Sequence, residues 1–159
     1  MTSQSAFADV IDAIYDAVNG SATLAAYPAN AYRLAVYDGP PIDDRSALIE
    51  IRIGATGEDY DEIAADIAQV WQSTDGQRDE TIDVPCCIWT RQGSTDVRTW
   101  RRRTSDVFNI VAGLLAGNTF GLTHLFTTEV SAGNLREIQA ADGAALVLAF
   151  TVHVMGSLP

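Results

Sequence analysis

The chain has 159 residues, of which 47% are hydrophobic, and its formal net charge is −11. This length predicts a single globular domain over residues 1–159, large enough to bury a core without disulfides or metals. The negative charge argues against general affinity for DNA, because a protein that grips phosphates needs a positive surface. A protein that surrounds DNA without gripping it is compatible with this charge.

The sequence indicates neither export nor membrane insertion nor a cofactor site. Residues 1–8 lack the charged start and the apolar stretch of a signal peptide. The most apolar run, residues 144–155, is far shorter than the roughly 20 residues of a membrane helix. Cys86 and Cys87 are adjacent on an expected strand and would point to opposite faces. We therefore expect packing or surface thiols, no cofactor, no metal and no membrane partner.

The first third of the chain predicts one helix and two strands. Residues 7–18 repeat apolar side chains at helical spacing, so we expect a helix there and a connector over residues 21–30. Residues 32–37 and 47–53 have strand patterns on either side of an Asp-Gly-Pro-Pro turn signal. We predict that these two strands form an antiparallel hairpin with a long loop.

The segment at residues 58–73 fits two conformations. Ile63, Ile67, Val70 and Trp71 fit one face of a helix, although a strand face through Ile63, Ala65, Ile67 and Trp71 is an alternative. We favour a helix, because the segment contains several alanines and alanine is depleted in strands. Its acidic start lacks the ligand order of a calcium loop and is better explained as a solvated first turn.

Residues 80–93 and 97–115 predict a strand followed by a long amphipathic helix. Ser94 or Thr95 can cap the first turn, and Gly117 supplies a stop. The apolar positions of the helix recur with a period of 3.6, which predicts one buried face. These positions are Val97, Trp100, Thr104, Val107, Phe108, Val111, Leu114 and Leu115.

The last third predicts an antiparallel meander. Residues 122–130, 135–139 and 144–155 have strand patterns, residues 131–134 form a turn signal, and residues 156–159 are expected to be loose or docked on a neighbour. The whole order of elements indicates an α+β fold: a single domain with a mainly antiparallel β-sheet and helices packed on one face.

The sequence contains few groups that could support catalysis. It has no Gly-x-Ser-x-Gly motif, no phosphate-binding loop, no His-Glu-x-x-His motif and no dinucleotide-binding glycine motif. His124 and His153 lie on expected strands that could be neighbours, so a shared site is geometrically possible. We favour two partly exposed histidines on a polar sheet face, and we predict that the protein is not an enzyme, with no catalytic, cofactor-binding or metal-binding residues.

Arginine is the one unevenly distributed charge. Arg98, Arg101 and Arg102 are spaced i, i+3, i+4 opposite the apolar face of the helix, and we call these three the arginine stripe. A solvated helix face is one interpretation, because exposed charges usually contribute little. The other is a contact surface for an acidic partner, for which a second copy of this acidic chain is a candidate. On that interpretation the arginine stripe and Arg103 form a subunit or partner interface.

Several stretches, in order and over most of the chain, resemble one protein family. They are Val36–Pro40, Arg78–Cys86, Trp89 with Gly93, Glu129–Leu135 and Phe150–Val154. Together they resemble the tail terminator proteins of long-tailed, siphovirus-type bacteriophages, particularly those that infect actinobacteria.

This resemblance implies a ring, typically of six subunits, that caps the head-proximal end of the tail tube. Such a ring stops tube polymerisation and joins the tail to the head connector. The implied partners are other copies of the chain, the tail tube protein and a connector or stopper protein, with genomic DNA passing through the lumen without specific binding. The implied location is the tail-neck region of the virion, after assembly in the host cytoplasm.

Two alternatives stay open at this point. One is another neck component, such as a head-completion or stopper protein. The other, from a different class, is a small enzyme that uses His124 and His153.

Overall fold

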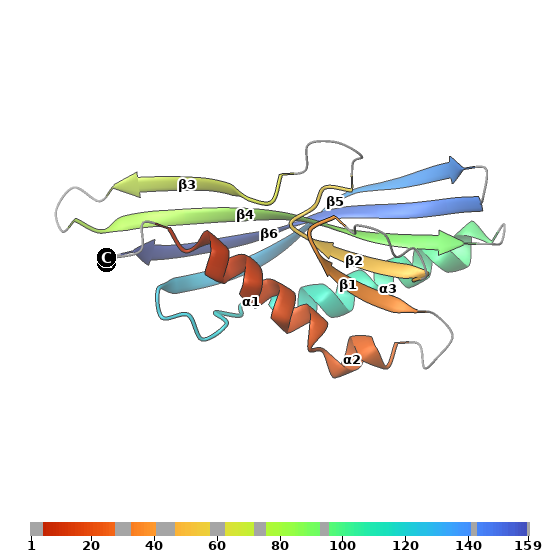
Figure 1. Ribbon diagram of the computed structural model, residues 1–159, viewed down its shortest axis with the longest axis horizontal. Helices are drawn as coiled ribbons and strands as arrows, with labels where there is room; N and C mark the ends of the chain where they lie inside the picture. The colour runs from red at the N-terminus through yellow and green to blue at the C-terminus, as the bar shows by residue number, and fades with distance from the viewer. Residues whose placement is uncertain are drawn as a thin grey trace.

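The computed structural model describes residues 5–27, 33–40, 47–57, 63–71, 76–92, 96–140 and 143–158 (Figure 1). The elements in chain order are α1 (Phe7–Asn19), α2 (Ala22–Ala25), β1 (Leu34–Asp38), β2 (Ile49–Ile53), β3 (Asp66–Trp71), β4 (Arg78–Gln92), α3 (Val97–Leu115), β5 (Leu125–Ala140) and β6 (Gly143–Leu158). The six strands form one mixed sheet, so the predicted α+β class is confirmed.

Two long central strands organise the sheet. β4 and β6 pair antiparallel over their whole length, from Arg78 opposite Leu158 to Gln92 opposite Ala144. β5 pairs with the outer edge of β6. The other edge of β4 is shared, because β3 pairs with its first part and β2 with its second part. The strand order is therefore β1-β2-β4-β6-β5, with β3 beside β2 on the same edge of β4.

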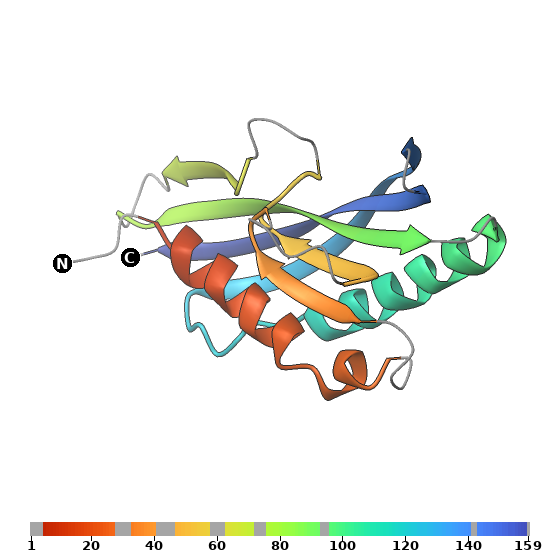
Figure 2. The same ribbon diagram turned by 45° about the vertical axis from the view of Figure 1, so that its right-hand side comes forward.

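The helices α1 and α3 contribute to one hydrophobic core on one face of the sheet (Figures 1 and 2). Helix α1 contacts β1 and β2, α3 contacts β4, β5 and β6, and the two helices contact each other. The buried positions of α1 are Val10, Ile14 and Val18, which are spaced by four residues as one face of a helix requires. Phe108 of α3 packs edge-on against Phe150 of β6, with 5.6 Å between ring centroids.

The predicted helix at residues 97–115 is confirmed, and so is its buried face. Trp100, Thr104, Val107, Val111 and Leu115 are buried. Val97, Phe108 and Leu114 are partly buried.

The ends of α3 are set by two residues. The Asp96 carboxylate accepts from the backbone N–H of Thr99 at 3.2 Å, so Asp96 is the N-cap. The hydrogen bonds from Thr99 lower the pKa of this carboxyl below its ordinary value. The expected caps, Ser94 and Thr95, lie outside the described residues. Beyond the helix, Gly117 has a φ of 72° and donates its N–H to the Thr128 carbonyl at 2.8 Å.

Helix α1 is capped by a residue from a distant strand. Its N-cap, Ala6, has no side chain that could accept, and the buried carboxylate of Glu80 on β4 instead accepts from the N–H of Ala6 itself, as the acidic residue of a capping box does. Glu80 Oε2 accepts from the Ala6 N–H at 3.0 Å, and Oε1 accepts from the Ser5 hydroxyl. A carboxylate also complements the positive end of the helix dipole. This contact joins the start of α1 to the first half of β4.

The predicted antiparallel hairpin of the first two strands is wrong. β1 and β2 pair in parallel, with Leu34 opposite Ile49 and Asp38 opposite Ile53. The connection between Asp38 and Ile49 can span roughly 33 Å when extended, about twice the length of a five-residue strand. The chain can therefore return to the start of β1 before it enters β2, and the antiparallel partner of β2 is β4.

The favoured helix at residues 58–73 is also wrong where the structure describes it. Residues 66–71 form strand β3, while residues 58–62 and 72–73 lie outside the described residues. β4 extends beyond β2, and β3 fills the edge that β2 leaves open. Backbone pairing to a preformed edge outweighs the weak helix preference of the alanines.

Three smaller predictions change as well. The turn signal at residues 131–134 is a bulge inside one continuous strand, β5, where the register shifts between Ala132 and Leu135. A glycine is needed there, because a Cβ on Gly133 would lie 2.9 Å from the Ala149 carbonyl oxygen. The tail expected to be loose continues β6 to Leu158, which is buried. The connector at residues 21–30 contains the short helix α2, capped by Ser21.

Candidate functional site

The arginine stripe lies on the outer surface of α3, as predicted from its spacing. Arg98, Arg101 and Arg102 are exposed, and Arg103 is partly buried. Arg101 Nη2 lies 2.8 Å from Glu137 Oε1 on β5, and Arg103 stacks 5.2 Å from the centre of the Trp100 ring. Two of the four arginines therefore contact their own chain, and an interface role for this surface stays a prediction.

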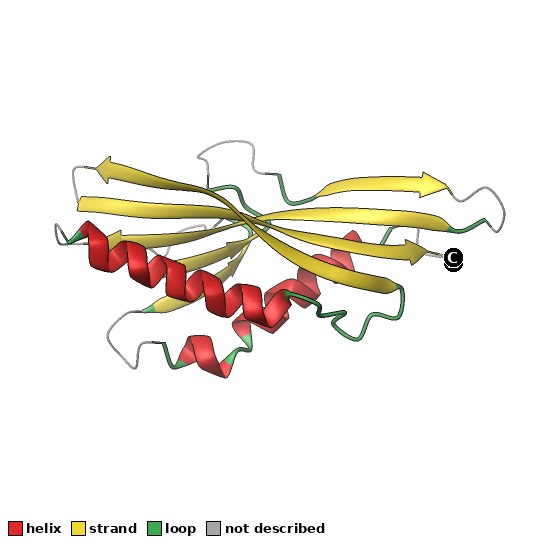
Figure 3. Ribbon diagram, turned by 180° about the vertical axis from the view of Figure 1, so that it is seen from behind, coloured by secondary structure: helices red, strands yellow, loops and turns green. Residues whose placement is uncertain are grey.

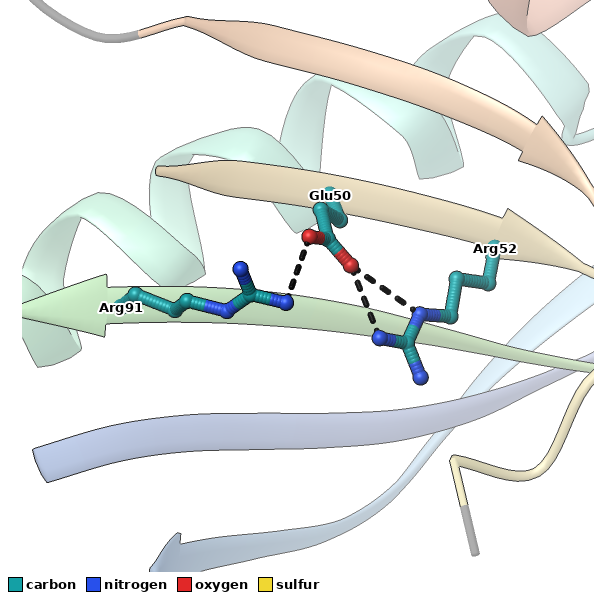
Figure 4. A network of polar contacts seen from close by, with 3 residues as sticks. All are labelled: Glu50, Arg52 and Arg91. Atoms are coloured by element: carbon teal, nitrogen blue, oxygen red, sulfur yellow. Dashed lines mark hydrogen bonds and ion pairs between the residues drawn. The ribbon is translucent and has the colours of Figure 1, made fainter. Parts of the chain in front are cut away.

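A buried carboxylate joins two arginines in a polar network (Figure 4). Glu50 on β2 is fully buried, and its Oε2 accepts from Arg52 Nη2 at 2.8 Å and from Arg52 Nε at 3.2 Å. Its Oε1 lies 2.8 Å from Arg91 Nη2, although this contact lacks regular hydrogen-bond geometry. The Arg52 guanidinium also stacks 4.6 Å from the centre of the Trp89 ring.

The Glu50 network lies on the face of the sheet opposite the helices, which we call the helix-free face. Successive strand residues alternate between faces, and Ile49, Ile51 and Ile53 point into the core on the other side. The Glu50–Arg52 pair was visible in the sequence as two charges two residues apart, but the sequence did not indicate its burial. A buried ion pair favours one arrangement of its strands more reliably than it adds stability.

A tight loop covers part of this network. Gly57 has a φ of 79°, and a Cβ there would lie 3.1 Å from both Cys87 Sγ and Trp89 Nε1 and 3.2 Å from Val147 Cγ1. The chain at Gly57 therefore packs directly on the helix-free face. The buried Trp89 Nε1 has no hydrogen-bond partner among the described residues.

Three side chains from three strands form a second cluster on the helix-free face. His153 Nδ1 of β6 lies 2.7 Å from Asp83 Oδ1 of β4, and His153 Nε2 lies 2.8 Å from Ser131 Oγ of β5. If Nδ1 carries the proton, it donates to Asp83 and the serine hydroxyl donates to Nε2. The order Ser-His-Asp is that of hydrolase triads.

The surroundings of this cluster do not match a hydrolase. Acyl transfer also needs donors aimed at the developing oxyanion, commonly backbone N–H groups. Asp83 and His153 lie on strands that are paired on both edges, so their backbone groups are used in the sheet. Ser131 lies on the edge strand β5, whose unpaired backbone groups point outward in the plane of the sheet and not toward the side chains on its face. We interpret the cluster as a cross-strand polar contact on an exposed sheet face.

The two histidines considered together in the sequence are apart in the structure. His124 precedes β5, and its carbonyl oxygen accepts from the Ser157 N–H at 2.9 Å. Ser157 lies four residues beyond His153 on β6, which corresponds to about 13 Å along a strand. The partners of His153, Ser131 and Asp83, were not predicted, because they are 22 and 70 residues away in sequence.

Acidic residues line up across the helix-free face around His153. Asp66, Asp83, His153 and Glu129 are directly opposite one another on β3, β4, β6 and β5. Side chains in such a row are cross-strand neighbours, about 5 Å apart at Cβ. The row therefore concentrates negative charge on one face of the sheet.

Within the described residues, no group of three or more His, Cys, Asp and Glu side chains is arranged to hold a metal ion. None of the described helices combines the length and the apolar character needed to cross a membrane.

Comparison with known proteins gives a likeness in structure and none in sequence. No protein-family model matches the chain, and no curated protein matches it. Among solved structures, a chain from "Virion of native gene transfer agent (GTA) particle" superposes with a TM-score of 0.64 at 19% sequence identity. The match covers 97% of this chain and 100% of that chain. The two chains therefore share a fold over nearly their whole length.

Proposed function

We propose that this chain is a structural protein of a phage-like virion, of the tail terminator type. The observation that carries the proposal is the shared fold with a component of a gene transfer agent virion, which spans 97% of this chain. The sequence resemblance to tail terminators, which rests on different observations, points to the same kind of particle. In this role the protein is not an enzyme.

The proposed assembly is a ring, of six copies in our proposal, at the head-proximal end of the tail tube. The ring stops tube polymerisation and joins the tail to the head connector or stopper. It assembles in the host cytoplasm and stays in the tail-neck region of the virion of a long-tailed phage, with actinobacteria as the expected hosts.

The charge of the chain suits a channel for DNA. A net charge of −11 and the acidic row on the helix-free face would repel phosphates, so that DNA could pass through a lumen without sticking. The arginine stripe lies on the outer surface of α3, where it can meet an acidic neighbour.

The test is the tail phenotype of a phage that lacks this gene. Loss of termination predicts overlong tubes that are not attached to heads, visible by electron microscopy, and complementation with the gene should restore tails of normal length. Normal tails in the deletion would refute the proposal. Tails of normal length that stay unattached would favour a head-completion or stopper protein instead.

The enzyme alternative has a simple test. The Ser131→Ala/His153→Ala double variant removes two members of the polar cluster on exposed strands. Complementation by this variant at the wild-type level would remove the main support for catalysis, whereas assembled but inactive particles would restore it.

A further inference from the structure

β3 presents an unprotected edge. It pairs with β4 through Asp66–Trp71, and no described strand pairs with its other edge. An edge strand offers a row of backbone N–H and C=O groups to any approaching strand. In Figure 1, β3 is the outermost strand of the part of the sheet that projects beyond the helices.

The residues of β3 do not discourage pairing. Its six residues include one charge, Asp66, at the start of the strand, and no proline. Every residue of the strand is exposed, and Val70 and Trp71 have exposed fractions of 66% and 67%. Natural sheets usually protect such edges with charges, prolines or bulges. An edge that carries four exposed apolar side chains, Ile67, Ala68, Val70 and Trp71, is therefore suited to a partner strand.

Side-chain contacts fix β3 to β4 in the single copy. Gln69 Nε2 donates to Glu80 Oε1 at 2.8 Å, and Arg78 Nη1 donates to Gln69 Oε1 at 3.3 Å. The Arg78 guanidinium stacks 4.8 Å from the centre of the Trp71 ring. Because Glu80 also caps α1, the strand is tied through β4 to the core. Preorganisation lowers the entropy lost when a strand pairs.

The opposite edge of the same sheet belongs to β5 (Figure 3). β5 has 16 residues, and β6 is its one described strand partner. Its charged residues are Glu129, Arg136 and Glu137, so three of its 16 residues are charged and both signs occur along the strand. Phe126 and Leu135 are exposed apolar side chains on β5.

We propose that β3 of one copy pairs with the β5 edge of a second copy, so that the sheets of neighbouring copies become continuous. The two edges are different and lie on opposite sides of one sheet, so the contact is head-to-tail and repeats around a ring. This inference rests on the proposed ring, and names the strands that close it.

The first test traps the contact with engineered cysteines. Val70→Cys chains are mixed with differently tagged chains that carry Thr127→Cys, Glu129→Cys or Arg136→Cys, which share the helix-free face with Val70. The matched controls carry Ala35→Cys or Tyr37→Cys on β1, on the same face. The native cysteines are buried and do not compete. We expect a disulfide between copies with at least one β5 position and with neither β1 position.

The second test removes the edge. The Val70→Lys/Trp71→Glu variant should stay folded, because both side chains are exposed and the lost stacking of Arg78 on Trp71 is weak at an exposed site. It should not form rings by light scattering or electron microscopy. Leu48→Lys is the control, an exposed apolar residue just before β2. It should form rings normally.

The outcomes separate this inference from the proposed function. Wild-type rings that cross-link through β1, or through two copies of Val70, overturn the β3–β5 contact and leave the ring intact. Rings formed normally by the Val70→Lys/Trp71→Glu variant do the same. A wild-type chain that stays monomeric when concentrated and when mixed with tail tube protein overturns both.

Discussion

The Arg52→Met variant tests whether burial makes the Glu50 network strong. Methionine keeps much of the apolar stem of arginine but removes the hydrogen bonds from Arg52 Nε and Nη2 to Glu50 Oε2 and the stacking on Trp89. Arg91 stays 2.8 Å from the other carboxylate oxygen, so the buried charge is only partly uncompensated. Breaking a buried pair costs about 3–5 kcal/mol. We take the lower end and expect a loss of about 3 kcal/mol in the free energy of unfolding.

The matched control is Arg101→Met. Its partner Glu137 is also 2.8 Å away, but the two side chains are 52% and 50% exposed, against 11% and 0% for Arg52 and Glu50. An exposed pair contributes about 0–1 kcal/mol.

Urea unfolding followed by circular dichroism gives both free energies, provided that the m-value is unchanged. The expected loss for Arg52→Met corresponds to a melting temperature lowered by roughly 6–12 °C. Equal losses in Arg52→Met and Arg101→Met would refute the reasoning, because the Arg52 pair is buried and has an additional hydrogen bond and the stacking on Trp89.

The remaining predictions concern a loop, a thiol and the arginine stripe. Gly57→Ala should lower the free energy of unfolding by about 2 kcal/mol or more, measured with urea, since it adds a clash to the strain of a positive φ. The control Gly76→Ala, with a φ of 69° and open space around it, should lower it by only about 1 kcal/mol. Equal losses would argue against close packing at Gly57. Burial raises the pKa of the Cys86 thiol from 9.0 to about 12, so the folded state favours the protonated thiol. The contribution of this thiol to stability is therefore full below pH 9 and falls as the pH rises toward 12. A thiol reagent at pH 8 should react with Cys86 only after unfolding. Rapid labelling of the native chain would contradict this. Arg101→Glu/Arg102→Glu should fold normally but form few rings by light scattering, and normal rings would mean that the arginine stripe is only a solvated surface.

The long helix and the central strands could be predicted because their patterns are local. The apolar side chains of residues 97–115 recur with the helical period, and α3 buries that face. Residues 80–93 and 144–155 carry strand patterns, and the structure has β4 over residues 80–92 and β6 over residues 144–155. Such patterns reflect burial of one side of an element, so they need no knowledge of its neighbours.

The candidate surfaces were only partly predictable. Spacing placed the arginine stripe on the outer face of its helix. Neither the contact between Arg101 and Glu137 nor the cluster of Ser131, His153 and Asp83 could be predicted, because each joins elements that are distant in the chain. Contacts of this kind depend on the strand order and register, which local patterns do not specify.

By itself, the sequence determined the class of fold and the position of the core-facing helices, since periodic burial is encoded residue by residue. Only the tertiary structure decided that β1 and β2 run parallel, that residues 66–71 form a strand and that residues 131–134 form a bulge. In each case the local signal was a turn, a loop or a weak propensity worth well under about 1 kcal/mol per residue. Pairing along the edges of β4 and β6 outweighed these signals, because a strand that joins a preformed edge satisfies several backbone groups at once.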